Sequence, residues 1–172
     1  VCLLFQYAGM SFVDFAHLKE RNIKNGILDY NRQKTGTPMR LEIWDTAELM
    51  RKELMGDKKP ASGYLFPFLS GTKTGYEAYL EYNAALSRFN RNLKTLKEVA
   101  GIASDVTSYT IRHSFAMALK EQNVPIEMIS ELLGHKSIKT TQIYLRSFSL
   151  EKMTVVNKSC FENVYNYMPE VG

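Results

Sequence analysis

Four short segments of this 172-residue chain hold side chains suited to bind an anion and to attack it. They lie at residues 32–36, 108–115, 132–135 and 140–144 and supply arginine, lysine, histidine and tyrosine. Arginine forks and histidine N–H groups stabilise charge on phosphate oxygens. A lysine ammonium can protonate a leaving oxygen, and a tyrosine hydroxyl can form a covalent intermediate. Each segment alone is common in proteins, so the information lies in the order and spacing of all four.

Taken together, the segments resemble the catalytic domain of the tyrosine recombinases, the phage-integrase family. They read Arg-Gln-Lys-Thr-Gly, Ser-Tyr-Thr-Ile-Arg-His-Ser-Phe, Leu-Leu-Gly-His and Thr-Thr-Gln-Ile-Tyr. The second is similar to the form found in the branch carried by Bacteroides-type mobile elements. The resemblance runs from about residue 3 to about residue 165. It implies a site-specific DNA recombinase or integrase that cleaves and rejoins strands through a 3′-phosphotyrosyl intermediate, with no metal and no cofactor.

The resemblance also implies roles for individual residues. Tyr144 matches the nucleophile, Arg112 the second catalytic arginine and His135 a phosphate ligand. Lys34, on a predicted turn, matches the general acid. Tyr109 stands where the family usually has a histidine, and its hydroxyl can donate to a phosphate oxygen but cannot act as an imidazole near neutral pH. Each residue has a structural alternative as well: a packing tyrosine, a buried ion pair, a helix cap or an exposed turn lysine.

The largest departure from the family pattern concerns its first catalytic arginine. That position is occupied by Ser11, and the position used instead in the Bacteroides-type branch is Ala8. Loss of a bidentate cation is expected to slow phosphoryl transfer by orders of magnitude. Either another cation substitutes, or the chain is a catalytically impaired DNA-binding relative whose activity Ala8→Arg or Ser11→Arg would restore. Asp14, at the acidic family position, is predicted to act as a helix cap and buttress.

Two other enzyme classes share part of this pattern. A type IB topoisomerase uses the same chemistry and would relax supercoiled DNA without site preference, but the short integrase-like motif spacing argues against it. A metal-dependent nuclease is disfavoured because no carboxylate cluster accompanies the histidines. The expected partner is therefore a double-stranded DNA recombination site.

Charge is compatible with this partner. Lysine and arginine number 22 against 18 acidic residues, which gives a net charge of +4 and a pI near 9.0. Positive side chains recur along the predicted helix over residues 76–100, where they form either a solvated face or a track for the DNA backbone. The candidates for backbone contact are Arg88, Arg91, Lys94 and Lys139.

Composition predicts one globular domain over residues 1–172, since 45% of residues are hydrophobic and 23% are charged. The chain has no membrane-length apolar run, and its two cysteines fit a reducing bacterial cytoplasm. It begins abruptly at Val1, which favours the C-terminal catalytic part of a longer integrase whose N-terminal core-binding domain is absent. We expect a homotetramer on DNA for the full protein and a monomer for the isolated fragment.

The elements that position these residues follow from periodicity and turn signals. The fold class is mainly α with a small antiparallel β-sheet. A hairpin over residues 27–33 and 39–44 holds the lysine turn. Helices are predicted at 3–18 with a break at Gly9, and at 45–55, 76–100, 109–120, 125–133 and 138–146. A last amphipathic helix, 150–168, packs either on its own domain or on a neighbouring protomer.

Overall fold

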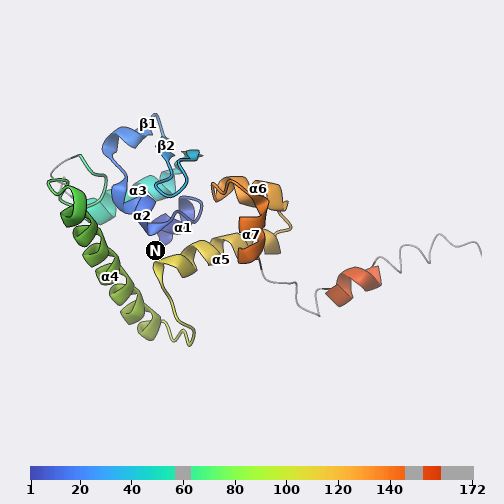
Figure 1. The fold of residues 1–172 in the computed structure, drawn as a ribbon. Coiled ribbons are helices and arrows are strands. Elements are labelled where there is room, and N and C mark those ends of the chain that lie inside the picture. Colours follow the sequence, from blue (N-terminus) through green and yellow to red (C-terminus); the bar gives the residue numbers. More distant parts are fainter. Residues whose placement is uncertain (57–62, 146–152, 160–172) are drawn as a thin grey trace, which may run out of the picture.

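A computed structural model describes residues 1–56, 63–145 and 153–159. The described residues confirm a helix-rich fold with one small sheet (Figure 1). The helices are α1 (Cys2–Gln6), α2 (Phe12–His17), the short 3-10 helix η1 (Glu20–Asn22), α3 (Asp45–Met55), α4 (Gly75–Val99), α5 (Ser108–Glu121), α6 (Ile126–Leu132) and α7 (Ile138–Tyr144). The strands are β1 (Ile23–Lys24), β2 (Ile27–Asn31) and β3 (Pro38–Glu42).

The sheet is antiparallel in the order β1-β2-β3. Leu28 pairs with Leu41 and Tyr30 pairs with Met39, so alternate residues of β2 and β3 face the core. This confirms the predicted hairpin, with shorter strands. The third strand, β1, was not predicted because it has only 2 residues, too few to show an alternating pattern.

Aromatic rings fill the centre of the fold. The rings of Phe15 and Phe66 stack with centroids 4.1 Å apart, and Phe66 is fully buried. Phe12 stacks on Phe89 of α4 at 4.6 Å, and Phe68 packs against both groups. The short helix α2 therefore joins the long helix α4 to the rest of the core, which holds α2 in a fixed position beside the hairpin.

Helix α5 links this core to the C-terminal helices, and Figure 1 shows it running from the region of α1 toward α6 and α7. Its first turn is fixed by Thr107, whose hydroxyl caps the backbone N–H of Thr110. Asn90 of α4 accepts a hydrogen bond from the Ser108 backbone N–H at 2.9 Å. The helix therefore begins one residue earlier than the predicted 109–120, because Thr107 already holds the extended backbone that a cap requires.

The C-terminal end agrees less closely with expectation. Helix α7 ends at Tyr144, and the predicted extension to residue 146 falls partly outside the described residues. Of the predicted helix over 150–168, residues 153–159 are described and helical, with exposed side chains; the remainder lies outside the described residues. No helix in the described part of the chain is long and apolar enough to cross a membrane.

The aromatic centre generates a stability prediction. Replacing Phe66 with alanine removes a fully buried ring and should lower the free energy of unfolding by about 3–5 kcal/mol. Chemical denaturation followed by circular dichroism measures this change. Leu54→Ala is the matched control, since Leu54 is 62% exposed and its loss should cost less than about 0.5 kcal/mol. Equal effects of the two substitutions would contradict this description of the core.

Candidate active site

Arg112 lies at the centre of a hydrogen-bond network that joins three segments far apart in the chain. It is 4% exposed, and its Nη1 donates to the backbone oxygen of Gly9 at 3.0 Å. Its Nη2 donates to the backbone oxygen of Leu133 and lies 3.2 Å from His135 Nε2. The predicted pair of Arg112 and His135 is thus brought together, at the junction of α5 and the end of α6.

The imidazole of His135 is fixed from both sides. Its Nδ1 lies 2.8 Å from the hydroxyl of Thr141, a fully buried residue of α7. Because a guanidinium can only donate, Nε2 must accept the bond from Arg112, and the ring proton is assigned to Nδ1. Burial, together with the positive charges of Arg112, Arg32 and Lys34, lowers the pKa of His135 to about 4. His135 is therefore neutral at physiological pH.

Gly134 allows the backbone to turn sharply between the end of α6 and His135. It has a φ of +60°, which L side chains rarely adopt. A Cβ at this position would lie 2.5 Å from both Arg32 Cδ and Met39 Sδ. The turn at Gly134 therefore directs His135 into the site and also lets the β2–β3 hairpin approach the end of α6.

Arg32 is the residue of the site that sequence reasoning missed. It is 6% exposed, and its Nη1 donates to the backbone oxygens of Leu133 at 3.0 Å and Gly134 at 3.1 Å. Its Nε lies 3.4 Å from Asp14 Oδ2. An arginine next to a predicted turn is usually exposed, so its burial was not expected. The available signal was its place in the lysine segment of a chain that lacks one catalytic arginine.

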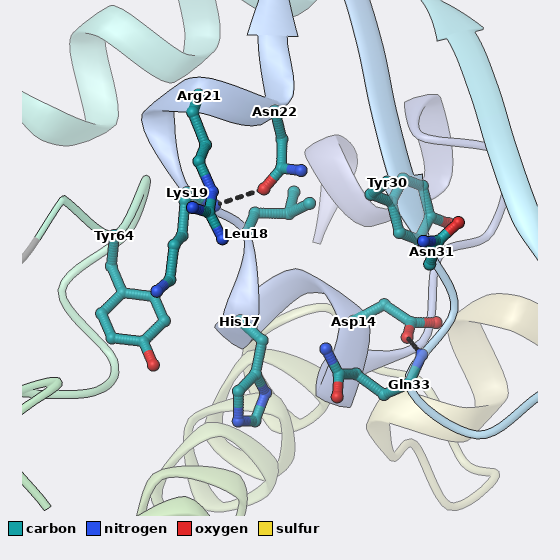
Figure 2. A pocket seen from close by; sticks show the side chains of 10 residues that line it. All are labelled: Asp14, His17, Leu18, Lys19, Arg21, Asn22, Tyr30, Asn31, Gln33 and Tyr64. Atoms are coloured by element: carbon teal, nitrogen blue, oxygen red, sulfur yellow. Dashed lines mark hydrogen bonds between the residues drawn. The ribbon is translucent and has the colours of Figure 1, made fainter. Parts of the chain in front are cut away.

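Asp14 holds the hairpin against α2, as the buttress prediction proposed. Its carboxylate is buried and accepts bonds from the Ser11 hydroxyl at 2.5 Å and the Gln33 backbone N–H at 2.7 Å. Figure 2 shows the second of these bonds. The Ser11 side chain makes no bond that caps α2 and donates to Asp14 instead. The buried Asp14 carboxylate is a strong acceptor for the Ser11 hydroxyl because it is charged.

A cavity of about 410 Å³ opens beside Asp14 (Figure 2). The Lys19 ammonium lies 5.2 Å from the centre of the Tyr64 ring at its edge. Within the described part of the chain, the residues predicted to be catalytic lie outside this cavity. A second hollow, of about 350 Å³, borders His135 and Gly134 directly and is lined also by Thr37, Ser130, Ser137 and Ile138.

The other predicted site residues lie around this network. Lys34 is exposed on the hairpin turn, and Tyr109 is 59% exposed in the first turn of α5. Tyr144 is the last residue of α7; its side chain lies outside what the structure describes. Ala8 is buried and has a φ of +53°. Among the described residues, no group of His, Cys, Asp and Glu side chains could hold a metal ion.

The cations predicted to contact a DNA backbone fall in two places. Arg88, Arg91 and Lys94 are exposed on α4, which lies across α1 and α2 from α6 and α7 (Figure 1). Lys139 is exposed on α7, close in sequence to Thr141. The two interpretations of the α4 cations, a solvated face or a backbone track, stay open.

Comparison with known proteins gives the family of this chain. The family model described as phage integrase family matches residues 1–151. The chain belongs to the phage integrase family. This agrees with the resemblance of the four segments, whereas the Bacteroides-type branch stays a prediction.

Curated members of the phage integrase family are similar over part of the chain. Tyrosine recombinase XerD of Lacticaseibacillus casei is 42% identical over 69 residues, which are 40% of this chain and 24% of the relative. Tyrosine recombinase XerC of Rickettsia typhi is 41% identical over 75 residues, or 44% of this chain and 24% of the relative. The matched regions therefore span about a quarter of these relatives.

Solved structures confirm the fold. The XerA recombinase superposes with a TM-score of 0.65 at 24% identity, over 90% of this chain and 55% of that one. The Tn1549 transposon integrase, in complex with a circular intermediate DNA, superposes with a TM-score of 0.64 at 15% identity, over 91% and 56%. The described helices and sheet are those of a tyrosine recombinase catalytic domain.

The neutral state of His135 generates a pH prediction. The unfolded imidazole titrates near 6.5 and the folded one near 4, so the unfolded chain binds more protons between these values. The contribution of this group to the free energy of unfolding is therefore fully present above about pH 6.5 and declines as pH falls toward 4. Thermal unfolding across this range, compared with His135→Gln, should show a shallower loss of stability in the variant. Parallel pH profiles would contradict the assignment.

Proposed function

We propose that this chain is the catalytic domain of a site-specific DNA recombinase that cleaves and rejoins strands through Tyr144. The observation that carries the proposal is the continuous network from Arg112 on α5 through His135 to Thr141 on α7. Helix α7 also contains Tyr144. Two anion-binding side chains are thereby tied to the helix that bears the nucleophile, in a chain that belongs to the phage integrase family.

Arg112 and His135 would bind the non-bridging oxygens of the scissile phosphate. The guanidinium of Arg112 can only donate, whereas the Nε2 of His135 accepts the bond from Arg112. A phosphate oxygen beside Nε2 favours a proton there, because the anion offsets the positive charges around the ring. The Thr141 hydroxyl accommodates this change, since it can donate to Nδ1 as readily as accept from it.

The covalent step exchanges one ester for another. The phenolic oxygen of Tyr144 attacks phosphorus and forms a 3′-phosphotyrosyl bond, and its proton passes to solvent. The bond from phosphorus to the 5′ oxygen breaks, and that oxygen takes a proton from the Lys34 ammonium. Attack by the 5′-hydroxyl of another strand reverses each transfer. The bond energy is kept in the intermediate, so rejoining needs no cofactor.

Double-stranded DNA is the proposed partner, with Lys139 and the exposed cations of α4 as candidates for backbone contact. A homotetramer on DNA, a separate core-binding domain in the full protein and exchange of the 150–168 helix between protomers are further parts of this proposal. They are supported by the family resemblance. A type IB topoisomerase would instead relax a supercoiled plasmid that lacks any recombination site.

Covalent trapping tests the nucleophile. The full natural protein is incubated with nicked duplexes tiled across the DNA that flanks its gene, so that cleavage releases a short strand and cannot be reversed. We expect an adduct that is stable to denaturation and forms equally well in EDTA, because the proposed mechanism uses no metal. Tyr144→Phe should abolish it, and Tyr109→Phe should not replace Tyr144 as the attachment site. Absence of any adduct with the natural protein would overturn the proposal.

The general acid has its own test. Lys34→Ala should slow cleavage of a normal duplex by about 100-fold or more. A duplex with sulfur in place of the 5′ bridging oxygen should restore the rate, because a thiolate leaves without a proton. Lys24→Ala, which removes an exposed lysine at the far end of the sheet, is the matched control and should change neither rate. Failure of the sulfur substrate to rescue Lys34→Ala would assign Lys34 a different role.

A further inference from the structure

The position of the family's first catalytic arginine holds Ser11, yet a guanidinium lies beside it. The Ser11 hydroxyl and Arg32 Nε share one acceptor, Asp14 Oδ2, at 2.5 Å and 3.4 Å. Ser11 is small enough to leave room for the Arg32 side chain, which enters from the turn directly after β2. A positive charge therefore stands next to the vacated position, although it comes from another part of the chain.

Arg32 also lies close to the second arginine. The backbone oxygen of Leu133 accepts a hydrogen bond from Arg32 Nη1 and another from Arg112 Nη2. Two guanidinium groups that share one acceptor repel each other unless negative charge is nearby. Asp14 supplies one such charge, and it is bound on the side of Arg32 away from Leu133.

The charges around His135 also favour the binding of an anion. Among the described residues, Arg112, Arg32 and Lys34 all place positive charge near its ring. With Asp14 included, the cluster carries more positive than negative charge. A phosphodiester carries one negative charge and has two non-bridging oxygens, which matches two guanidinium donors.

Arg32 has a donor left for such a ligand. Its hydrogen bonds with described residues use Nε and Nη1. Among the described residues, no hydrogen bond uses its Nη2, and the side chain keeps 6% of its surface exposed. The guanidinium is thus held at Nε and Nη1, which leaves Nη2 as its donor for a ligand.

We infer that Arg32 supplies the guanidinium of the missing first arginine and that its Nη2 donates to a non-bridging oxygen of the scissile phosphate. The inference rests on the proposed function, because it concerns the same phosphate that Tyr144 attacks. It makes Arg32 a catalytic residue, and it decides between the two alternatives for this chain: another cation substitutes, so the enzyme is not impaired.

Cleavage rates of three variants test the contribution of the charge. With the full natural protein on the duplex that gives the adduct, Arg32→Gln should lower the rate by about 100- to 1,000-fold. Arg32→Lys should recover part of this loss. The matched control is Arg51→Gln, which removes a partly buried arginine paired with Glu48 on α3, away from the site. An Arg32→Gln rate equal to that of Arg51→Gln would overturn the inference.

A neutral scissile phosphate distinguishes a catalytic Arg32 from one that only supports the fold. When a methyl group replaces a non-bridging oxygen of the scissile phosphate, there is less charge to stabilise. The Arg32→Gln defect should then shrink to less than about tenfold, because the lost cation stabilised that charge. A defect of unchanged size on the neutral substrate would show that Arg32 only supports the fold. The double variant Asp14→Asn/Arg32→Gln, which leaves no unpaired buried carboxylate, checks the outcome if Arg32→Gln fails to fold.

Complementation tests the position. Ser11→Arg should raise the rate of the Arg32→Gln protein by at least about tenfold, since it returns a guanidinium to the same phosphate oxygen. In the natural background Ser11→Arg should give no gain, because Arg32 already fills the space beside Asp14. A similar gain in both backgrounds would overturn the inference.

Phosphate binding separates this inference from the proposed function. If the natural protein forms no adduct, inorganic phosphate should still raise its unfolding temperature relative to chloride at equal ionic strength. Arg32→Gln should lose most of that shift, and Arg51→Gln should keep it. Equal shifts in all three proteins would overturn the role of Arg32 even where cleavage through Tyr144 is observed.

Discussion

The site depends on one backbone oxygen, the carbonyl of Leu133. The last carbonyl groups of a helix have no partner within it and carry partial negative charge. At the end of α6, Leu133 uses that free carbonyl to accept bonds from Arg112 of α5 and Arg32 of the hairpin. The contact from Arg32 joins the hairpin to the end of α6, and the contact from Arg112 joins α5 to it, so the arrangement of the site and the packing of these elements depend on the same atom.

The parts of this arrangement that are local in sequence could be predicted. The hairpin follows from alternation and turn residues, α3 and α4 follow from helical periodicity, and the spacing of Arg112 and His135 placed them in one site. The bond from Ser11 to Asp14 and the burial of Arg32 could not be predicted in this way. Both depend on Asp14, whose carboxylate is shared by Ser11 at the start of α2 and by residues of the hairpin turn, and a competition between distant partners leaves no periodic signal.

Ser11 and Arg32 show that a guanidinium can come from a different position in the sequence and still lie at the same place in the fold. The long side chain of Arg32, directly after β2, reaches the region beside Ser11 that the family's first arginine would occupy. The aromatic core makes this feasible, because Phe12 and Phe15 hold α2 on either side of Asp14. The buried carboxylate then orients whichever guanidinium is present. A comparison of motifs finds no arginine at position 11, whereas the folded chain has the Arg32 guanidinium beside it.

The hairpin turn has a consequence for proton delivery. Arg32 is anchored through its side chain and through its backbone, which bonds to Thr37 and Gly36, whereas Lys34 is exposed two residues further on. Two extended residues span about 7 Å at most. The backbone of Lys34 therefore stays within this distance of the anchored Arg32. Movements of the turn leave the Lys34 ammonium in a small volume around Arg32. In the proposed mechanism, this tether keeps the local concentration of acid near the 5′ oxygen high without any closed, rigid contact.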